Sequence, residues 1–159
     1  MSPLPEPAER IALRATAREF TRREVVPHLQ HWEDAGEVPR DLHLRAGELG
    51  LLGVGFAEEV GGSGGDLADS VAMQESMFAA GASSGLMAAL FTGGIALPHI
   101  AALGEADLVE RFVRPTLAGS LIGSLAVTEP DGGSDVASIR TTARRDGGDY
   151  VVNGAKTFI

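Results

Sequence analysis

The pattern of apolar residues changes once along the chain, near Gly119, and this change constrains the fold more than any other feature. Before it, apolar residues recur three and four positions apart, as they do on one face of a helix. After it, short apolar runs alternate with glycine-containing turns, as in β structure. The sequence therefore predicts an α+β chain, with a helical domain over residues 1–120 and the opening strands of an antiparallel β domain over residues 121–159.

The helical part contains several segments with an apolar face. In the first, Leu13, Ala17 and Phe20 share one side, and Pro27 is expected to end or kink the helix because proline has no N–H to donate. The same spacing marks three further faces: Leu42, Ala46 and Leu49; Leu67, Val71 and Phe78; and Leu108, Val109, Phe112 and Val113.

Residues suited to helix ends separate these faces. Gly50 is expected to end the second helix, Asp66 to cap the third, and Pro115 to stop the last. The segment 55–66 between two of them contains five glycines. It lacks the spacing of a phosphate-binding loop and carries two glutamates, which would repel phosphate, so a flexible connector is favoured.

The residues after Gly119 are expected to form strands. The run 120–130 is apolar, contains small residues and is long enough for a buried strand. Later strands are expected to be joined by a glycine-containing loop at 146–149 and by a tight turn at Asn153-Gly154. These few strands cannot close a sheet, and Ile159 falls within a strand, so the sequence looks cut short.

Charge and composition exclude several classes of function. The chain has 13 Lys and Arg against 22 Asp and Glu, a formal net charge of −9, which argues against nucleic-acid binding by charge neutralisation. It has no cysteine, which excludes disulfides, thiolate metal sites and a cysteine nucleophile, and is compatible with the cytoplasm. His28 and His31 could share a helix face, but an exposed helix end is favoured over a metal site.

The stretch from Ser76 to Gly104 has no charged residue and is long enough to cross about 30 Å of hydrocarbon as a helix. Gly, Ser, Pro and His interrupt it, and it lacks flanking basic or aromatic anchors. We therefore expect parts of two helices buried within protein, and no membrane span. The first ten residues lack the apolar core of a signal peptide.

The loop Leu125–Asp135, LAVTEPDGGSD, carries the residues with most chemical potential. Pro130 keeps the residue before it extended, and Gly132-Gly133 let the backbone approach a ligand closely. Their amides, with the hydroxyls of Thr128 and Ser134, could hold a phosphate oxygen. The alternative is a surface turn, in which Asp and Gly serve turn geometry. An anion site further requires that three carboxylates point away from it: Glu129, Asp131 and Asp135.

The order TEPDGGSD, TTAR and GGDYVVNGAKTFI, after a helical region of this length, resembles the acyl-CoA dehydrogenase family. The specific motifs run from Leu125 to Ile159, and the helical region agrees more loosely, so the resemblance covers essentially the whole chain. It implies an FAD-dependent enzyme with an N-terminal helical domain, a barrel-like middle β domain and a C-terminal helical domain.

The resemblance also implies roles for individual residues. Val127 and Thr128 would contact the isoalloxazine ring, Ser134 would reach the flavin pyrophosphate or the acyl-CoA, and Phe158 would pack beside the ring. Leu125 stands where relatives often have an aromatic residue. The implied cofactor-binding set is Leu125, Ala126, Val127, Thr128, Gly133, Ser134, Phe158 and Ile159, with Ser134 also binding substrate.

The reaction implied is removal of the α-proton of an acyl-CoA by a glutamate base, with hydride transfer from the β-carbon to FAD. That base lies in the family's C-terminal domain, beyond Ile159, so no catalytic residue is expected here; Glu75 has no such role in the match. The implied partners are an acyl-CoA substrate, further copies of the chain in a dimer or tetramer, and an electron-transfer flavoprotein. Alternatives are an acyl-CoA oxidase, a flavin monooxygenase or a non-catalytic helical assembly module.

Overall fold

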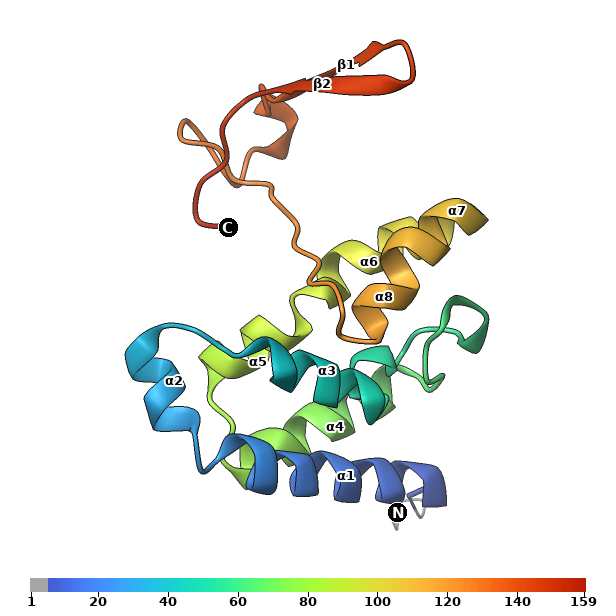
Figure 1. Ribbon diagram of the computed structural model, residues 1–159, viewed down its shortest axis with the longest axis vertical. Helices are drawn as coiled ribbons and strands as arrows, with labels where there is room; N and C mark the ends of the chain where they lie inside the picture. Colours follow the sequence, from blue (N-terminus) through green and yellow to red (C-terminus); the bar gives the residue numbers. More distant parts are fainter. Residues whose placement is uncertain (1–5) are drawn as a thin grey trace, which may run out of the picture. The chain divides into compact units, whose positions relative to one another are not determined.

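The computed structural model describes residues 6–159, which form two compact units that meet in sequence at Gly123. We call the first, up to Gly123, the helical unit, and the second, from Ser124 to Ile159, the strand unit (Figure 1). The helical unit precedes two antiparallel strands in one open sheet. The expected α+β fold class is confirmed.

Short helices follow one another through the helical unit, joined by tight turns. π-helical turns lie at Thr21–Val25 and Val109–Val113, and 3-10 turns at Leu51–Gly53 and Glu58–Val60. The α-helices are α1 (Ala8–Phe20), α2 (Leu29–Ala35), α3 (Arg40–Glu48), α4 (Leu67–Ala80), α5 (Ser84–Phe91), α6 (Gly93–Leu103), α7 (Ala106–Leu108) and α8 (Arg114–Leu117).

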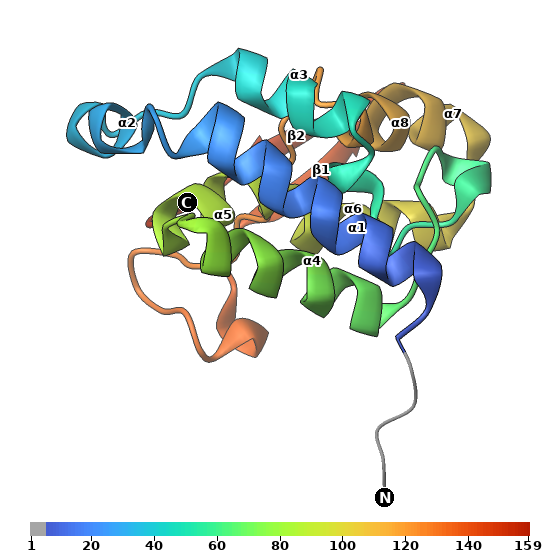
Figure 2. The ribbon, with the colours of Figure 1, turned by 90° about the horizontal axis from the view of Figure 1, so that it is seen from below.

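The main apolar core lies where α1 and α4 run side by side (Figure 2). Ala17 and Phe20 of α1 are fully buried there, as their spacing predicts, and Leu13 packs against them. The α3 face is confirmed in the same way, with Leu42 and Ala46 buried in this core. Helical periodicity therefore identified the inward sides of α1 and α3 correctly.

The apolar face predicted for α4 is the exposed one. Leu67, Val71 and Phe78 are 80%, 48% and 47% exposed, while Met73 and Met77 face the core. Polar contacts with α1 orient α4 in this way. The Arg10 Nε donates to Asp69 Oδ1 at 2.7 Å, and the Arg14 Nη1 donates to the Ala72 carbonyl at 3.0 Å. Because these anchors lie on one side of α4, the methionines beside them turn inward and the larger apolar residues turn outward.

The two prolines behave differently. Pro27 follows the π turn Thr21–Val25 and separates it from α2, so the expected break is confirmed. Pro115 does not stop its helix, which continues to Leu117. A π turn at Val109–Val113 precedes it, and Pro115 occupies the first turn of α8, where a proline costs no helical hydrogen bond.

A second apolar cluster joins α6 to the last helical segment. Its buried members are Leu97, Val109, Val113 and Leu117. The expected apolar face on this segment is confirmed for Val109 and Val113, whereas Phe112 is 39% exposed. The Phe112 ring contacts the Arg111 guanidinium, whose central carbon lies 5.0 Å from the ring centre.

Helices α5 and α6 together span Ser84–Leu103, a helical stretch long and apolar enough, by length and composition, to cross a membrane. Some of its residues, including Leu86, Leu90 and Leu97, are buried in the two clusters, while Ile95 and Leu103 are exposed. Pro98 lies inside α6. That this stretch is not a membrane span remains a prediction.

The strand unit is built around one hairpin, in which β1 (Thr142–Asp146) pairs antiparallel with β2 (Asp149–Asn153). Asp146 pairs directly with Asp149, so Gly147-Gly148 forms a two-residue turn, with Gly147 at φ 63°. The predicted glycine-containing loop is confirmed. Both faces of the hairpin are exposed.

The second predicted turn, Asn153-Gly154, is not a hairpin turn. After β2 the chain returns to Thr128, whose carbonyl accepts the Thr157 N–H at 3.0 Å. Gly154 serves close packing instead, because a Cβ there would collide with the Thr141 side chain. The strong local preference of Asn-Gly for a hairpin yields to contacts made by more distant residues.

The apolar run 120–130 does not form the expected buried strand. It is extended and largely exposed, with one isolated bridge between Glu129 and Gly132. A strand needs a continuous ladder of backbone hydrogen bonds with a neighbour, and within residues 6–159 this run makes only isolated ones. High apolar content alone was therefore a poor guide here.

Candidate functional site

Two segments that the sequence placed in one site lie together in the strand unit. The first is the loop Leu125–Asp135, which we call the TEP loop, and the second is the segment 156–158. Lys156 Nζ donates to the Val127 carbonyl at 2.8 Å, and the Thr157 N–H donates to the Thr128 carbonyl at 3.0 Å. These contacts bring Val127 and Thr128 beside the residue that precedes Phe158.

Glu129 holds the TEP loop to the rest of the strand unit. Its carboxylate accepts hydrogen bonds from the Arg140 N–H at 2.8 Å, the Thr141 N–H at 2.9 Å, the Thr141 hydroxyl at 2.6 Å and the Lys156 Nζ at 3.0 Å. The residue is only 8% exposed, although the chain around it is open to solvent. We call this cluster of Glu129, Arg140, Thr141 and Lys156 the Glu129 cluster.

The electrostatics of the cluster favour an ionised carboxylate. The hydrogen bond from the Thr141 hydroxyl, followed by those from the Arg140 and Thr141 amides and from Lys156, lowers the pKa of Glu129 to about 2. Glu129 is therefore charged at neutral pH and forms a partly buried ion pair with Lys156.

From the sequence, Glu129 was expected only to oppose anion binding, and Lys156 was not predicted to have a role. The available signal was Lys156, the only basic residue in the two segments, opposite the three carboxylates of the TEP loop. The other two acidic residues of the loop are exposed: Asp131 pairs with Arg140 at 3.1 Å, and Asp135 accepts the Ser138 hydroxyl at 2.6 Å.

The twin glycines form a tight turn that supplies part of the expected anion site. The Gly132 N–H already donates to the Glu129 carbonyl at 3.1 Å. Within residues 6–159, the amides of Gly133 and Ser134 have no protein acceptor. A Cβ on Gly133 would lie 3.3 Å from the Thr128 methyl carbon, so glycine permits a close approach at this point. The Gly133 and Ser134 amides therefore remain available to a ligand, whereas the Gly132 amide does not.

The other predicted cofactor residues present an apolar surface. Phe158 is 95% exposed and adopts φ 56°, which is uncommon for a bulky residue and is typical of functional sites. Ile159, Leu125 and Ala126 are also exposed, while Val127, Thr128 and Gly133 are half-buried. The strand unit thus brings Val127, Thr128, Gly133 and Ser134 into one loop and places Phe158 next to it.

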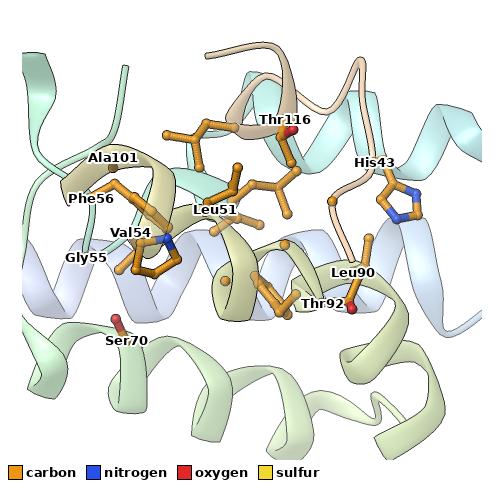
Figure 3. A pocket seen from close by; sticks show the side chains of 18 of the residues that line it. His43, Leu51, Val54, Gly55, Phe56, Ser70, Leu90, Thr92, Ala101 and Thr116 are labelled. Atoms are coloured by element: carbon orange, nitrogen blue, oxygen red, sulfur yellow. The ribbon is translucent and has the colours of Figure 1, made fainter. Parts of the chain in front are cut away.

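The helical unit contains a separate cavity of about 560 Å³, which the sequence did not predict (Figure 3). Apolar side chains dominate its lining, among them Leu51, Phe56 and Leu90. His43 also lines it and is 4% exposed; its Nε2 lies 3.3 Å from the Ala89 carbonyl, and its Nδ1 has no partner among the described residues. This size and polarity suit a small apolar ligand.

Three other features noted in the sequence lie in the helical unit. The glycine-rich segment 55–66 is a connector, as expected, but it is not the flexible one expected, because backbone hydrogen bonds close it, including Gly55 N–H to the Gly64 carbonyl at 2.8 Å. Asp66 caps α4 in a capping box with Asp69, as predicted. His28 and His31 are exposed, and no group of three metal-ligating side chains occurs within the described part of the chain.

Comparisons with known proteins identify the family and the fold. Residues 7–120 match the N-terminal domain of acyl-CoA dehydrogenases, and residues 124–159 match the middle domain. The chain is 40% identical over 153 residues to the mitochondrial long-chain specific acyl-CoA dehydrogenase of Mus musculus, a match that covers 96% of this chain and 35% of the relative.

Two solved structures share the fold. A probable acyl-CoA dehydrogenase from Mycobacterium abscessus aligns with a TM-score of 0.92 and 64% identity, covering 96% of this chain and 40% of that protein. A glutaryl-CoA dehydrogenase from Mycobacterium smegmatis, in complex with FADH2, aligns with a TM-score of 0.84 and 28% identity over 95% of this chain and 39% of that protein. The chain thus spans 35–40% of the length of these relatives, and it belongs to the acyl-CoA dehydrogenase family.

Proposed function

We propose that the chain forms the N-terminal helical domain and one wall of the flavin site of an FAD-dependent acyl-CoA dehydrogenase, which introduces an α,β double bond into an acyl-CoA thioester. One observation carries the proposal. The Glu129 cluster holds together the TEP loop and the segment 156–158, the two segments that the family resemblance assigns to the flavin. The structural relative that contains FADH2 supports the choice of cofactor.

The residues of this wall suit FAD in chemistry. The exposed ring of Phe158 can pack against a flat heteroaromatic ring, and the Thr128 hydroxyl can donate to its polar edge. The Gly133 and Ser134 amides can hold a phosphate oxygen, and we assign Ser134 a second contact with the acyl-CoA. FAD, when bound, accepts the hydride, while these residues bind and orient it. No residue of this chain is proposed as the catalytic base.

Further expectations depend on the family and on composition. Family membership supports assembly into a dimer or tetramer, a role in fatty-acid metabolism, and an electron-transfer flavoprotein as electron acceptor. A cytoplasmic location is supported only by the cysteine-free composition. Each is a proposal that size measurement, reconstitution with the acceptor, or localisation of the tagged protein can test.

FAD binding and acyl-CoA oxidation by the full gene product test the main proposal. We expect flavin to co-purify, and acyl-CoA to bleach its absorbance and reduce an acceptor dye. The 159-residue polypeptide alone should bind FAD weakly or not at all and should show no dehydrogenation, because it supplies one wall of the site. A full gene product without affinity for FAD would contradict the proposal. The rate at which oxygen reoxidises the reduced flavin separates a dehydrogenase from an oxidase or monooxygenase.

A further inference from the structure

We propose that Glu129 and Lys156 are positioning residues for the flavin: together they hold the Thr128 amide N–H as a free hydrogen-bond donor on the side of the TEP loop opposite Lys156. This inference rests on the proposed function, because it concerns the same site. It assigns a task to two charged side chains that need not touch the cofactor.

The argument begins with the peptide group between Val127 and Thr128. Its carbonyl accepts a hydrogen bond from Lys156 Nζ at 2.8 Å. Since the described peptide bonds are all trans, the carbonyl and the N–H of one peptide group point in opposite directions. The Thr128 N–H therefore points away from Lys156. Among residues 6–159 it has no acceptor.

The next peptide group has no free donor to offer. Its carbonyl, that of Thr128, accepts the Thr157 N–H at 3.0 Å, and its N–H, that of Glu129, donates to the Gly132 carbonyl at 2.8 Å. Both sides of this group are used within the strand unit. Of these two consecutive peptide groups, only the one held by Lys156 keeps a donor for a ligand.

Glu129 is what keeps Lys156 in this place. The Lys156 side chain is 21% exposed and that of Glu129 is 9% exposed. A lysine withdrawn this far from water needs a partner charge, which Glu129 supplies at 3.0 Å. Glu129 is itself fixed by the amides of Arg140 and Thr141. Without the carboxylate, Lys156 would return to solvent and release the Val127 carbonyl.

A fixed amide donor matters to a flavin for an electrostatic reason. The ring carries carbonyl oxygens and ring nitrogens that accept hydrogen bonds, and reduction makes them richer in electrons. A preorganised donor therefore stabilises the reduced ring more than the oxidised ring. Loss of the donor should weaken FAD binding and lower the reduction potential of the bound flavin.

The experiment uses the full gene product and four variants. E129Q keeps the size of the side chain but presents an amide N–H₂ to groups that are donors, and K156M removes the charge. K156R keeps a cationic donor and serves as the rescue. D131N, in the same loop, is the control because Asp131 and its partner Arg140 are both mostly exposed.

Two readouts are measured. Hydrogen–deuterium exchange of peptides covering 139–146 and 155–159, in protein stripped of flavin, reports the Glu129 cluster directly. FAD affinity and the reduction potential of the bound flavin report its effect on the cofactor. For E129Q and K156M we expect exchange to speed up and FAD affinity to fall, each by about tenfold, as for loss of one charge-assisted hydrogen bond, with a more negative potential. K156R and D131N should resemble the wild type.

The outcomes separate this inference from the proposed function. Unchanged exchange in E129Q would show that the Glu129 cluster does not hold these segments, and would overturn the inference. Faster exchange with unchanged FAD affinity and unchanged reduction potential would show that the Glu129 cluster has only a structural role. That result would also overturn the inference. A wild-type protein that binds no FAD would overturn the proposed function and the inference together.

Discussion

The helical unit and the strand unit are stabilised by different forces. The fully buried apolar residues of the described chain, from Ala17 to Leu117, all belong to the helical unit. The strand unit has an exposed hairpin, and its one buried residue is the charged Glu129. Apolar burial is strong but not directional, whereas a hydrogen-bonded ion pair fixes distances between specific atoms. Within the described residues, apolar packing holds the helical unit together, and directional hydrogen bonds around Glu129 hold the segments of the strand unit together.

The largest expected effect is in the core of the helical unit. Met77→Ala should lower the free energy of unfolding by about 2–5 kcal/mol, because Met77 is fully buried between α1 and α4. Phe78→Ala is the matched control; at 47% exposed it should cost less than about 1 kcal/mol. Urea unfolding followed by the fluorescence of Trp32, the sole tryptophan, measures both. Equal losses would mean that α4 is rotated differently.

Adding a methyl group at two helical glycines should change the free energy of unfolding by less, and with opposite signs. A Cβ on Gly47 of α3 would collide with the Ala118 carbonyl group, so Gly47→Ala should destabilise by about 1–3 kcal/mol. Gly94 of α6 faces open space, and Gly94→Ala should stabilise by up to about 0.5 kcal/mol through helix propensity. Thermal unfolding of the two variants compares them. Two changes of the same sign would contradict the packing described for α3.

Loss of the N-terminal cap of α4 should lower the free energy of unfolding by a smaller amount. Asp66→Ala removes the side chain that accepts the Asp69 N–H at 3.0 Å, and should cost about 1 kcal/mol. Asp131→Asn, which breaks an exposed ion pair in the strand unit, should cost less than about 0.5 kcal/mol. The same unfolding measurement distinguishes the two. A loss from Asp131→Asn as large as that from Asp66→Ala would show that the strand unit depends on surface pairs as well.

The effect of acid should be confined to the strand unit. The Thr141 hydroxyl and the other donors lower the pKa of Glu129 from 4.5 to about 2. A lowered pKa stabilises the folded form above the unfolded pKa, and this contribution is lost as pH falls from about 5 toward 2. The amide proton shifts of Arg140 and Thr141 in the folded protein, followed against pH, should titrate with the Glu129 carboxylate, with a midpoint at about pH 2. In Glu129→Gln the transition should disappear; its persistence would assign it to another group.

Some of the structure could be predicted because it depends on neighbours in sequence. The inward sides of α1 and α3, the Asp66 cap and the turn at Gly147-Gly148 follow from spacing and turn chemistry. The resemblance likewise identified the family. The wrong predictions for α4 and for Asn153-Gly154 share one feature: they depend on partners far along the chain. Asn153-Gly154 forms no hairpin turn because Gly154 packs against Thr141, which lies twelve or more positions earlier.

The α4 face and the candidate site illustrate the same limit. Large apolar side chains suggested one side of α4, but Arg10 and Arg14, more than fifty positions away, present the other side to the core. In the TEP loop, Pro130 predicts an extended Glu129, yet nothing local indicates that its carboxylate meets Thr141 and Lys156.

The sequence by itself determined the family, through the order of its motifs, and the change from helical to β structure, because periodicity and turn chemistry act over short distances; the residues assigned to the flavin remain a prediction. Only the tertiary structure decided which side of α4 is buried, that 120–130 forms no strand, and that Glu129 and Lys156 hold the TEP loop to the segment 156–158. Those features depend on the energy of contacts between distant segments, which exists only once the chain has folded.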